Sequence, residues 1–276
     1  MSSKRPTLTS LNRFEMKKNA ALAIEAFALL RTKPSVQQLS CTMRLVLAGK
    51  VLHALLAEVT ADSFLGGYDP RLEDNIRTLN RLVEHARSNS LSFNVITPLN
   101  AKMTVPLFTG TTENEPDVLF LLNFTTLQRS ALLQSASTLA VLYTPENEHF
   151  GIGPVEGMIC GLPVLACDSG GPMESIVDQP PEKRTGWLRS PIREVWADAL
   201  EEIYLLDASE RGSLAQRAKH RAESVFGMGP MAKELERLLI ETVETGPVET
   251  WPMKGISFLF AFLFGLVLAV VSRQYS

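Results

Sequence analysis

The chain has 276 residues, of which 45% are hydrophobic and 21% are charged, and its formal net charge is −3. This composition excludes an intrinsically disordered chain and is sufficient for the buried core of one large domain or two small ones. The slightly acidic balance gives no electrostatic surface for a nucleic-acid partner, which normally needs a basic excess. Three cysteines without metal-ligand spacing predict neither a disulfide framework nor a structural metal site.

The first half of the chain alternates between helical and strand-like patterns. Apolar residues recur at helical spacing from Lys17 to Arg31, and Pro34 closes that segment. Further along, the patterns predict strands at 44–49, 91–96 and 118–122, helices at 72–88 and 126–135, and a polar loop at 110–116.

The second half repeats this alternation more regularly. The predicted strands are 139–143 and 163–167, and the predicted helices are 154–160, 172–177, 192–206, 209–225 and 231–245. Strands that alternate with helices pair in parallel through right-handed crossovers. The sequence therefore predicts an α/β fold with a doubly wound parallel sheet.

A long apolar segment lies near the C-terminus. Gly255 to Ser272 contains 18 residues without a charge and lies between Lys254 and Arg273. As a helix it spans about 27 Å at 1.5 Å per residue, close to the thickness of the hydrocarbon core of a bilayer. We therefore expect a transmembrane anchor over 254–273 behind a ligand-binding domain over 1–250, with its orientation left open by one cation on each side.

Two predicted loops after strands combine glycine with proline. Gly151, Ile152 and Gly153 lead into Pro154, which we expect at the first position of a helix. Residues 168–172, Asp-Ser-Gly-Gly-Pro, repeat the pattern after the next strand. Such loops can present backbone N–H groups to a phosphate, but ordinary helix starts in α/β proteins use the same residues.

Two carboxylates flank the first of these loops. Glu148 precedes the predicted helix, and Glu156 is expected in its first turn, eight positions later. Carboxylates at this spacing could accept hydrogen bonds from the hydroxyl groups of a sugar. The alternatives are a solvated loop charge for Glu148 and a favourable charge near a helix N-terminus for Glu156.

These residues form a recognisable motif. The segment 148–156, followed by 161–164 and 169–174, resembles the Glu-x7-Glu signature of glycosyltransferase family 4. Residues 11–19, 67–69 and 143–151 resemble, more narrowly, the mannosyltransferases of the dolichol-linked oligosaccharide pathway. The likeness covers most of residues 7–245.

The resemblance implies a fold, a reaction and a location. The fold would be the C-terminal Rossmann-like half of a GT-B glycosyltransferase. The reaction would be the retaining transfer of mannose from GDP-mannose to a dolichol-diphosphate-linked oligosaccharide, first alpha-1,3 and then alpha-1,6, in N-glycan precursor assembly. The location would be the endoplasmic reticulum membrane, with the catalytic domain facing the cytosol. No metal or other cofactor is expected.

The resemblance also implies roles for individual residues. The expected catalytic residues are Glu148, Arg13 and Lys18. Arg13 and Lys18 would neutralise the donor diphosphate as it leaves, and Glu148 would contact the transferred sugar. The remaining expected donor-binding residues are Phe150 and Gly151, beside the sugar and phosphates, and Glu156, at the ribose hydroxyls.

The sequence departs from the family pattern in two places. The family has an N-terminal acceptor domain, whereas this chain begins almost at the donor domain. In the family a strand matching 45–49 also runs directly into the residues matching Gly67, whereas here residues 50–66 intervene. We interpret this insert as a retained intron or a surface loop. The alternatives to an active mannosyltransferase are a catalytically silent, membrane-anchored binding fragment and a family member that uses another nucleotide sugar.

Overall fold

The computed structural model describes residues 5–38, 42–50, 67–97, 115–246, 260–265 and 273. It contains two compact units, residues 1–227 and 228–276. Nearly all of the insert 50–66, and most of the loop 110–116 and of the expected anchor 254–273, lie outside the described residues. Among the residues that are described, no helix is both long enough and apolar enough to cross a membrane.

The larger unit is built on one seven-stranded sheet, in which every neighbouring pair is parallel. The strand order is β3-β4-β2-β1-β5-β6-β7. The strands are β1 (Thr7–Leu11), β2 (Arg44–Lys50), β3 (Phe93–Ile96), β4 (Val118–Phe124), β5 (Thr138–Tyr143), β6 (Val164–Cys167) and β7 (Trp187–Arg189). The predicted doubly wound α/β architecture is confirmed.

The sequence patterns did not predict the central strand β1. Its residues Thr7, Thr9 and Ser10 are polar yet at most 1% exposed. The Thr7 hydroxyl donates to the Arg5 carbonyl at 2.9 Å and accepts from the Arg44 guanidinium at 2.9 Å, so its burial leaves no hydrogen bond unmade. Buried hydroxyls of this kind do not produce the apolar pattern by which a central strand is usually found.

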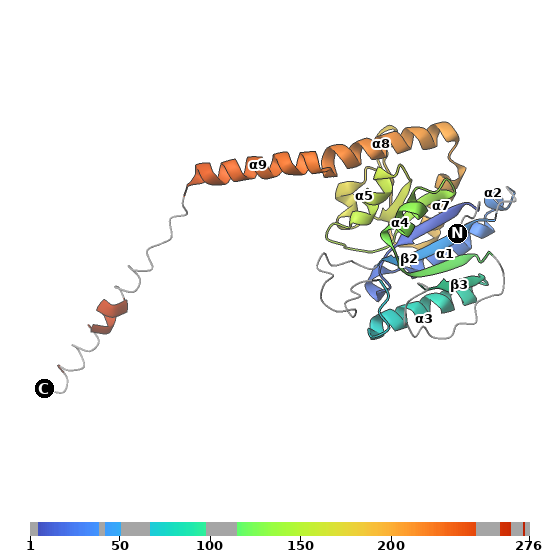
Figure 1. Ribbon diagram of the computed structural model, residues 1–276, viewed down its shortest axis with the longest axis horizontal. Coiled ribbons are helices and arrows are strands. Elements are labelled where there is room, and N and C mark those ends of the chain that lie inside the picture. Colours follow the sequence, from blue (N-terminus) through green and yellow to red (C-terminus); the bar gives the residue numbers. More distant parts are fainter. Residues whose placement is uncertain are drawn as a thin grey trace. The chain divides into compact units, whose positions relative to one another are not determined.

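Helices cover both faces of the sheet (Figure 1). The helices α1, α3 and α7 pack on one face, and α4, α5 and α8 pack on the other. The described helices of the larger unit are α1 (Ala21–Thr32), α2 (Pro34–Gln37), α3 (Glu73–Ser88), α4 (Thr126–Leu133), α5 (Ile152–Ile159), α6 (Pro172–Ser175), α7 (Arg193–Leu205) and α8 (Ala208–Phe226). Two 3₁₀ turns, η1 (Met16–Lys18) and η2 (Pro181–Lys183), accompany them.

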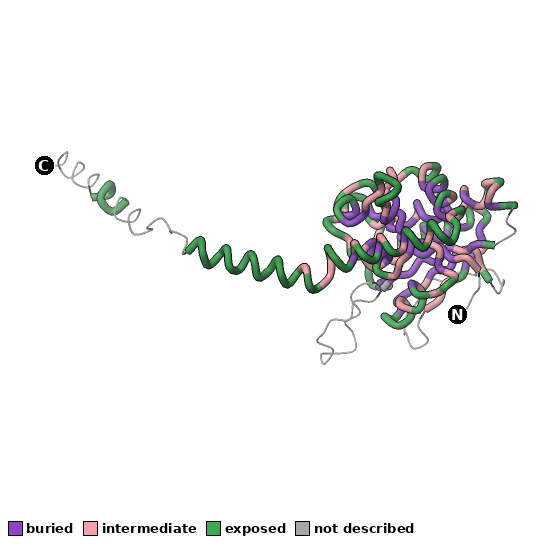
Figure 2. Tube along the Cα trace, turned by 90° about the horizontal axis from the view of Figure 1, so that it is seen from above, coloured by how far each residue is buried: buried purple, intermediate pink, exposed green. Residues whose placement is uncertain are grey.

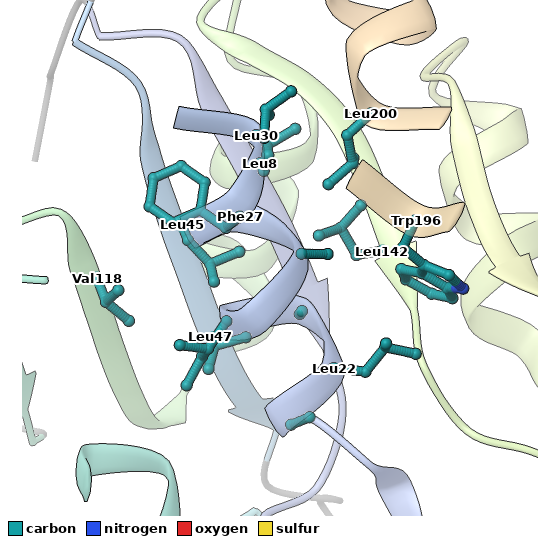
Figure 3. Packing of buried hydrophobic residues seen from close by; sticks show 14 of the residues in the cluster. Leu8, Leu22, Phe27, Leu30, Leu45, Leu47, Val118, Leu142, Trp196 and Leu200 are labelled. Carbon is teal, nitrogen blue, oxygen red and sulfur yellow. The ribbon is translucent and has the colours of Figure 1, made fainter. Parts of the chain in front are cut away.

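Strand β2 shows how one segment serves both layers. Leu45 and Leu47 pack with α1, whereas Val46 and Ala48 pack on the opposite face. Figure 3 shows Phe27 of α1 among the leucines of β1 and β2. This two-sided burial is typical of parallel strands. The buried residues gather in the interior of the larger unit (Figure 2).

The direction of the crossovers identifies the ligand-binding edge of the sheet. The chain leaves β1 for β2 through α1 on one face, and it reaches β5 from β4 through α4 on the other. The strand order therefore reverses between β1 and β5. In open α/β sheets, ligands bind beyond the carboxyl ends of the strands at such a switch point. Here that place is bordered by residues 12–19 after β1 and 144–151 after β5.

The smaller unit contains helix α9 (Met228–Thr245), which begins three residues before the predicted start. None of its residues is buried. Arg237 forms ion pairs with Glu234 at 2.6 Å and with Glu241 at 2.9 Å on the same helix, so its charged residues support one another at helical spacing.

Candidate donor-binding site

The loop between β5 and α5 carries Glu148, and backbone contacts hold it in place. The Asn147 N–H donates to the Ser169 hydroxyl at 3.0 Å, and the Gly171 N–H donates to the Glu148 carbonyl at 2.7 Å. Both partners lie in the loop that follows β6. The two glycine-rich loops are thus joined to each other at the edge of the sheet.

Close packing explains the glycines of the second loop. A Cβ atom on Gly170, where φ is +63°, would lie 2.3 Å from the Glu148 carbonyl oxygen. A Cβ atom on Gly171 would lie 2.2 Å from the Cα atom of Phe150. These glycines let two backbones meet. The Gly171 N–H is already bonded to Glu148, and α6 is only four residues long, so the second loop does not repeat the helix start of the first.

Tyr143 explains the glycines of the first loop. A Cβ atom on Gly151, where φ is +75°, would lie 2.3 Å from the Tyr143 hydroxyl, and one on Gly153 would lie 2.9 Å from its ring. The Tyr143 side chain therefore packs directly against Gly151 and Gly153. Burial first, and then the Glu148 carboxylate, raise the pKa of Tyr143 far above its usual value, so its hydroxyl stays neutral at physiological pH.

The predicted start of α5 was wrong. The helix begins at Ile152 with Gly151 as its N-cap, which makes Pro154 the third residue and Glu156 the fifth. Two glycines around the start weaken the helical pattern in the sequence, although the Tyr143 ring leaves room for nothing larger. Because Glu156 lies in the second turn, a favourable charge at the helix N-terminus does not account for it.

The structure brings Lys18 and Glu148 together across the switch point. The Lys18 ammonium, from η1, forms an ion pair with the Glu148 carboxylate, and their side chains are 15% and 26% exposed. The Thr144 hydroxyl donates to the Lys18 carbonyl at 2.7 Å. The Asn19 amide donates to the Glu146 carboxylate at 3.1 Å. Three contacts therefore join the turn after β1 to the loop after β5.

Arg13 lies in the same turn as Lys18, but its guanidinium contacts Glu15 at 3.4 Å rather than Glu148. Its side chain is 48% exposed. The turn is anchored by Phe14, which is buried and whose N–H donates to the Gly67 carbonyl at 3.2 Å. Arg13 is thus an exposed cation on a fixed turn.

Phe150 and Glu156 complete the predicted set. Phe150 is 39% exposed, and its ring centroid lies 5.6 Å from that of Phe226 at the end of α8. Glu156 forms an ion pair with Arg129 of α4, a residue that sequence reasoning did not identify. Arg129 is 27 positions away in the chain, and only the crossover that brings α4 beside α5 could have indicated it.

No cluster of three or more histidine, cysteine or acidic side chains suited to a metal occurs in the part of the chain that the structure describes. His149, beside Glu148, is exposed. The residues of the site contact one another through ion pairs and hydrogen bonds.

The part of the chain that holds most of this site matches a known protein family. Residues 108–221 match the family of glycosyl transferases group 1. This range contains Glu148, Glu156 and both glycine loops. The fold is also that of solved glycosyltransferases. Sucrose-phosphate synthase from Thermosynechococcus elongatus aligns with a TM-score of 0.60 and 18% identity, covering 89% of this chain and 47% of that one.

A second solved structure is the C-terminal domain of a glycosyl transferase group 1 family protein from Francisella tularensis. It aligns with a TM-score of 0.53 and 16% identity over 82% of this chain and 89% of that domain. Residues 108–221 thus match the glycosyl transferases group 1 family, and the chain shares its fold with the C-terminal domain of a protein of that family.

Over most of its length the chain is homologous to the alpha-1,3/1,6-mannosyltransferases. The enzyme of this name from Rhizomucor pusillus is 34% identical over 261 residues, which are 92% of this chain and 50% of the relative. The chain thus spans about half the length of the curated relative that it matches.

Proposed function

We propose that this chain binds GDP-mannose and acts in the retaining transfer of mannose to a dolichol-diphosphate-linked oligosaccharide, alpha-1,3 and then alpha-1,6. The observation that carries the proposal is the contact between Lys18 and Glu148 at the switch point of the sheet. It joins a cation suited to a phosphate and a carboxylate suited to a sugar. The homology to the alpha-1,3/1,6-mannosyltransferases supports the choice of sugar and acceptor.

The cations serve the leaving group. In mannose transfer the bond between C1 of mannose and the β-phosphate oxygen breaks, a bond from C1 to an acceptor hydroxyl oxygen forms, and the proton of that hydroxyl passes to the departing diphosphate. Negative charge grows on the departing GDP, and cations stabilise it more in the transition state than in the ground state. Lys18 sits at the edge of the sheet for this role, and the exposed Arg13 guanidinium extends from the same turn.

Glu148 serves the sugar. In the free protein its carboxylate is held by Lys18, and its backbone is held by Gly171, so the group is oriented before a ligand arrives. A carboxylate accepts hydrogen bonds from neighbouring sugar hydroxyls. Phe150 and Gly151 border the same turn, and Glu156 accepts the ribose hydroxyls of GDP in this proposal.

A transfer assay tests the proposal. We expect Glu148→Ala to lower the transfer of radiolabelled mannose from GDP-mannose to the lipid-linked acceptor by about 100-fold or more. Glu182→Ala, which removes an exposed carboxylate on η2, is the matched control and should leave the rate unchanged. Transfer by Glu148→Ala at the wild-type rate would refute the role of Glu148.

A second candidate function is a donor-binding module without turnover. It predicts GDP-mannose binding without transfer in the wild type. A third candidate, a family member with another nucleotide sugar, predicts that UDP-sugars displace GDP-mannose at similar concentrations.

The location is also a proposal. The uncharged segment 255–272 supports anchoring in the endoplasmic reticulum membrane, with the donor-binding domain in the cytosol. Alkaline carbonate extraction of cell membranes should leave the full chain in the pellet and release a chain that lacks residues 254–273. Release of both would contradict the anchor.

A further inference from the structure

We propose that Arg129 is a positioning residue, which fixes the Glu156 carboxylate in the orientation that receives the ribose of the donor. The inference rests on the proposed function, in which Glu156 accepts the ribose hydroxyls. Arg129 has no counterpart among the residues that the family motif indicates. Its role follows from its place in the fold.

The pair is enclosed. Arg129 Nη2 donates to Glu156 Oε1, and the two side chains are 17% and 22% exposed. The pair between Arg77 and Glu73 on α3 has the same chemistry, but its side chains are 70% and 75% exposed. Solvent and salt screen an enclosed pair less than an exposed one, so the first pair restrains its members more strongly.

Arg129 extends from a helix that is fixed at both ends. Thr125 and Gln128 form a capping box at the start of α4, and the Arg129 N–H donates to the Thr125 carbonyl at 3.0 Å. At the other end, the Thr138 hydroxyl of β5 donates to the Leu132 carbonyl at 2.6 Å. The Arg129 guanidinium therefore extends from a helix backbone that is fixed in position.

The helix that carries Glu156 is fixed as well. A Cβ atom on the next residue, Gly157, would lie 2.8 Å from Val164 and 3.1 Å from Val141, so α5 lies directly on β5 and β6. With both backbones fixed, the remaining freedom lies in the glutamate side chain, and the Arg129 contact restricts it. A group held in its binding orientation loses less entropy when the ligand arrives.

The charge of Arg129 has a second consequence. A donor diphosphate brings negative charge toward a site that already holds Glu148 and Glu156. A guanidinium is always protonated, so the positive charge of Arg129 beside Glu156 offsets part of the repulsion from the phosphates.

The test compares the binding of GDP and of 2′,3′-dideoxy-GDP, which lacks the ribose hydroxyls, by titration calorimetry on the full chain. We expect wild type to prefer GDP by about tenfold or more, because a site built to pair hydroxyls binds an analogue without them poorly. Glu156→Gln should abolish most of this preference. Arg129→Ala should reduce it by about fivefold, and Arg129→Lys should restore part of it.

A double substitution tests whether Arg129 affects nucleotide binding through Glu156. If Arg129 acts through Glu156, Arg129→Ala should cause no further loss of preference in the Glu156→Gln background. Arg77→Ala removes the exposed pair on α3 and should leave both affinities unchanged. If Arg129→Ala does not fold, as judged by thermal unfolding, Arg129→Gln and Arg129→Lys provide the same comparison.

Three results would overturn the inference, and they differ from failure of the proposed function. Arg129→Ala could weaken GDP and the dideoxy analogue equally, which would indicate a structural ion pair. It could keep the full wild-type preference for GDP. Its effect could also add to that of Glu156→Gln, which would place Arg129 on the ligand itself. If instead wild type binds both nucleotides equally or neither, the assignment of Glu156 fails, and the proposed function with it.

Discussion

The two glutamates of the signature are fixed by different parts of the protein. Glu148 lies in a loop whose backbone is held by Gly171 and whose carboxylate meets Lys18 from another strand end. Glu156 lies within a regular helix and is restrained through its side chain by Arg129. The two glutamates of the Glu-x7-Glu signature are therefore held in place by different kinds of contact.

This difference shows why the motif needs its surroundings. A loop becomes precise when a second loop packs against its backbone, which requires glycine at the contact. A helix already has a precise backbone, and only the side chain remains to be oriented. Changes that harm one glutamate should therefore leave the other in place, and the following predictions use that independence.

Among substitutions that leave both glutamates in the sequence, the largest effect should come from Gly171→Ala. Its Cβ atom would lie 2.2 Å from the Cα atom of Phe150, so the Glu148 loop must move. We expect transfer to fall by about 100-fold, because a displacement of about 1 Å is sufficient for that, with about 1–3 kcal/mol of lost stability. The preference for GDP over dideoxy-GDP, which reports on Glu156, should persist.

The control for this prediction is Gly212→Ala on α8. A Cβ atom there would meet nothing within 4 Å, so the same substitution should raise helix stability by about 0.5–1 kcal/mol without affecting transfer. Wild-type transfer by Gly171→Ala, measured alongside it, would show that the two loops do not need their close contact.

A smaller effect should follow Thr144→Val. It removes the hydroxyl that donates to the Lys18 carbonyl at 2.7 Å and keeps the shape of a fully buried side chain. We expect about 1 kcal/mol of lost stability and a roughly fivefold higher KM for GDP-mannose, because Lys18 loses its support. Thr7→Val loses a similar buried bond, to the Arg5 carbonyl at 2.9 Å, at the start of β1 and away from the site, and should lower stability without changing KM. Equal KM changes in both variants would refute the prediction.

The smallest effect on ligand binding should come from deleting residues 51–66. The residues on either side already meet, because a Cβ atom on Gly49 would lie 3.3 Å from the Gly67 carbonyl oxygen. We expect the free energy of unfolding, measured by chemical denaturation, to change by no more than about 2 kcal/mol, since loop closure depends weakly on length. The preference for GDP over dideoxy-GDP should be retained. Loss of folding would show that the segment is part of the core.

The sequence was most informative where the physical signal was local. The alternation of apolar strands and helices predicted the parallel sheet, because each element must bury a face against the next. It failed for β1 because hydroxyls replace apolar side chains there, and for β7, which has only three residues. The start of α5 was missed because Gly151 and Gly153 are weak helix formers whose role, packing on Tyr143, is tertiary.

The same distinction between local and tertiary signals applies to the residues of the candidate site. Glu148, Phe150, Gly151 and Glu156 lie in one continuous motif and could be identified from it. Lys18 was expected beside Glu148 only because of the family resemblance, since 130 positions separate them and no local pattern connects them. Arg129 was not expected at all, because a single arginine on a helix becomes informative only after the crossover places it against α5.

The most direct test of the account is the affinity of wild type and Glu148→Gln for GDP and for GDP-mannose, measured side by side. If Glu148 contacts the transferred sugar, Glu148→Gln should bind GDP as wild type does but lose the additional affinity that mannose provides, by about tenfold. An unchanged ratio of the two affinities in Glu148→Gln would contradict the placement of the sugar at Glu148.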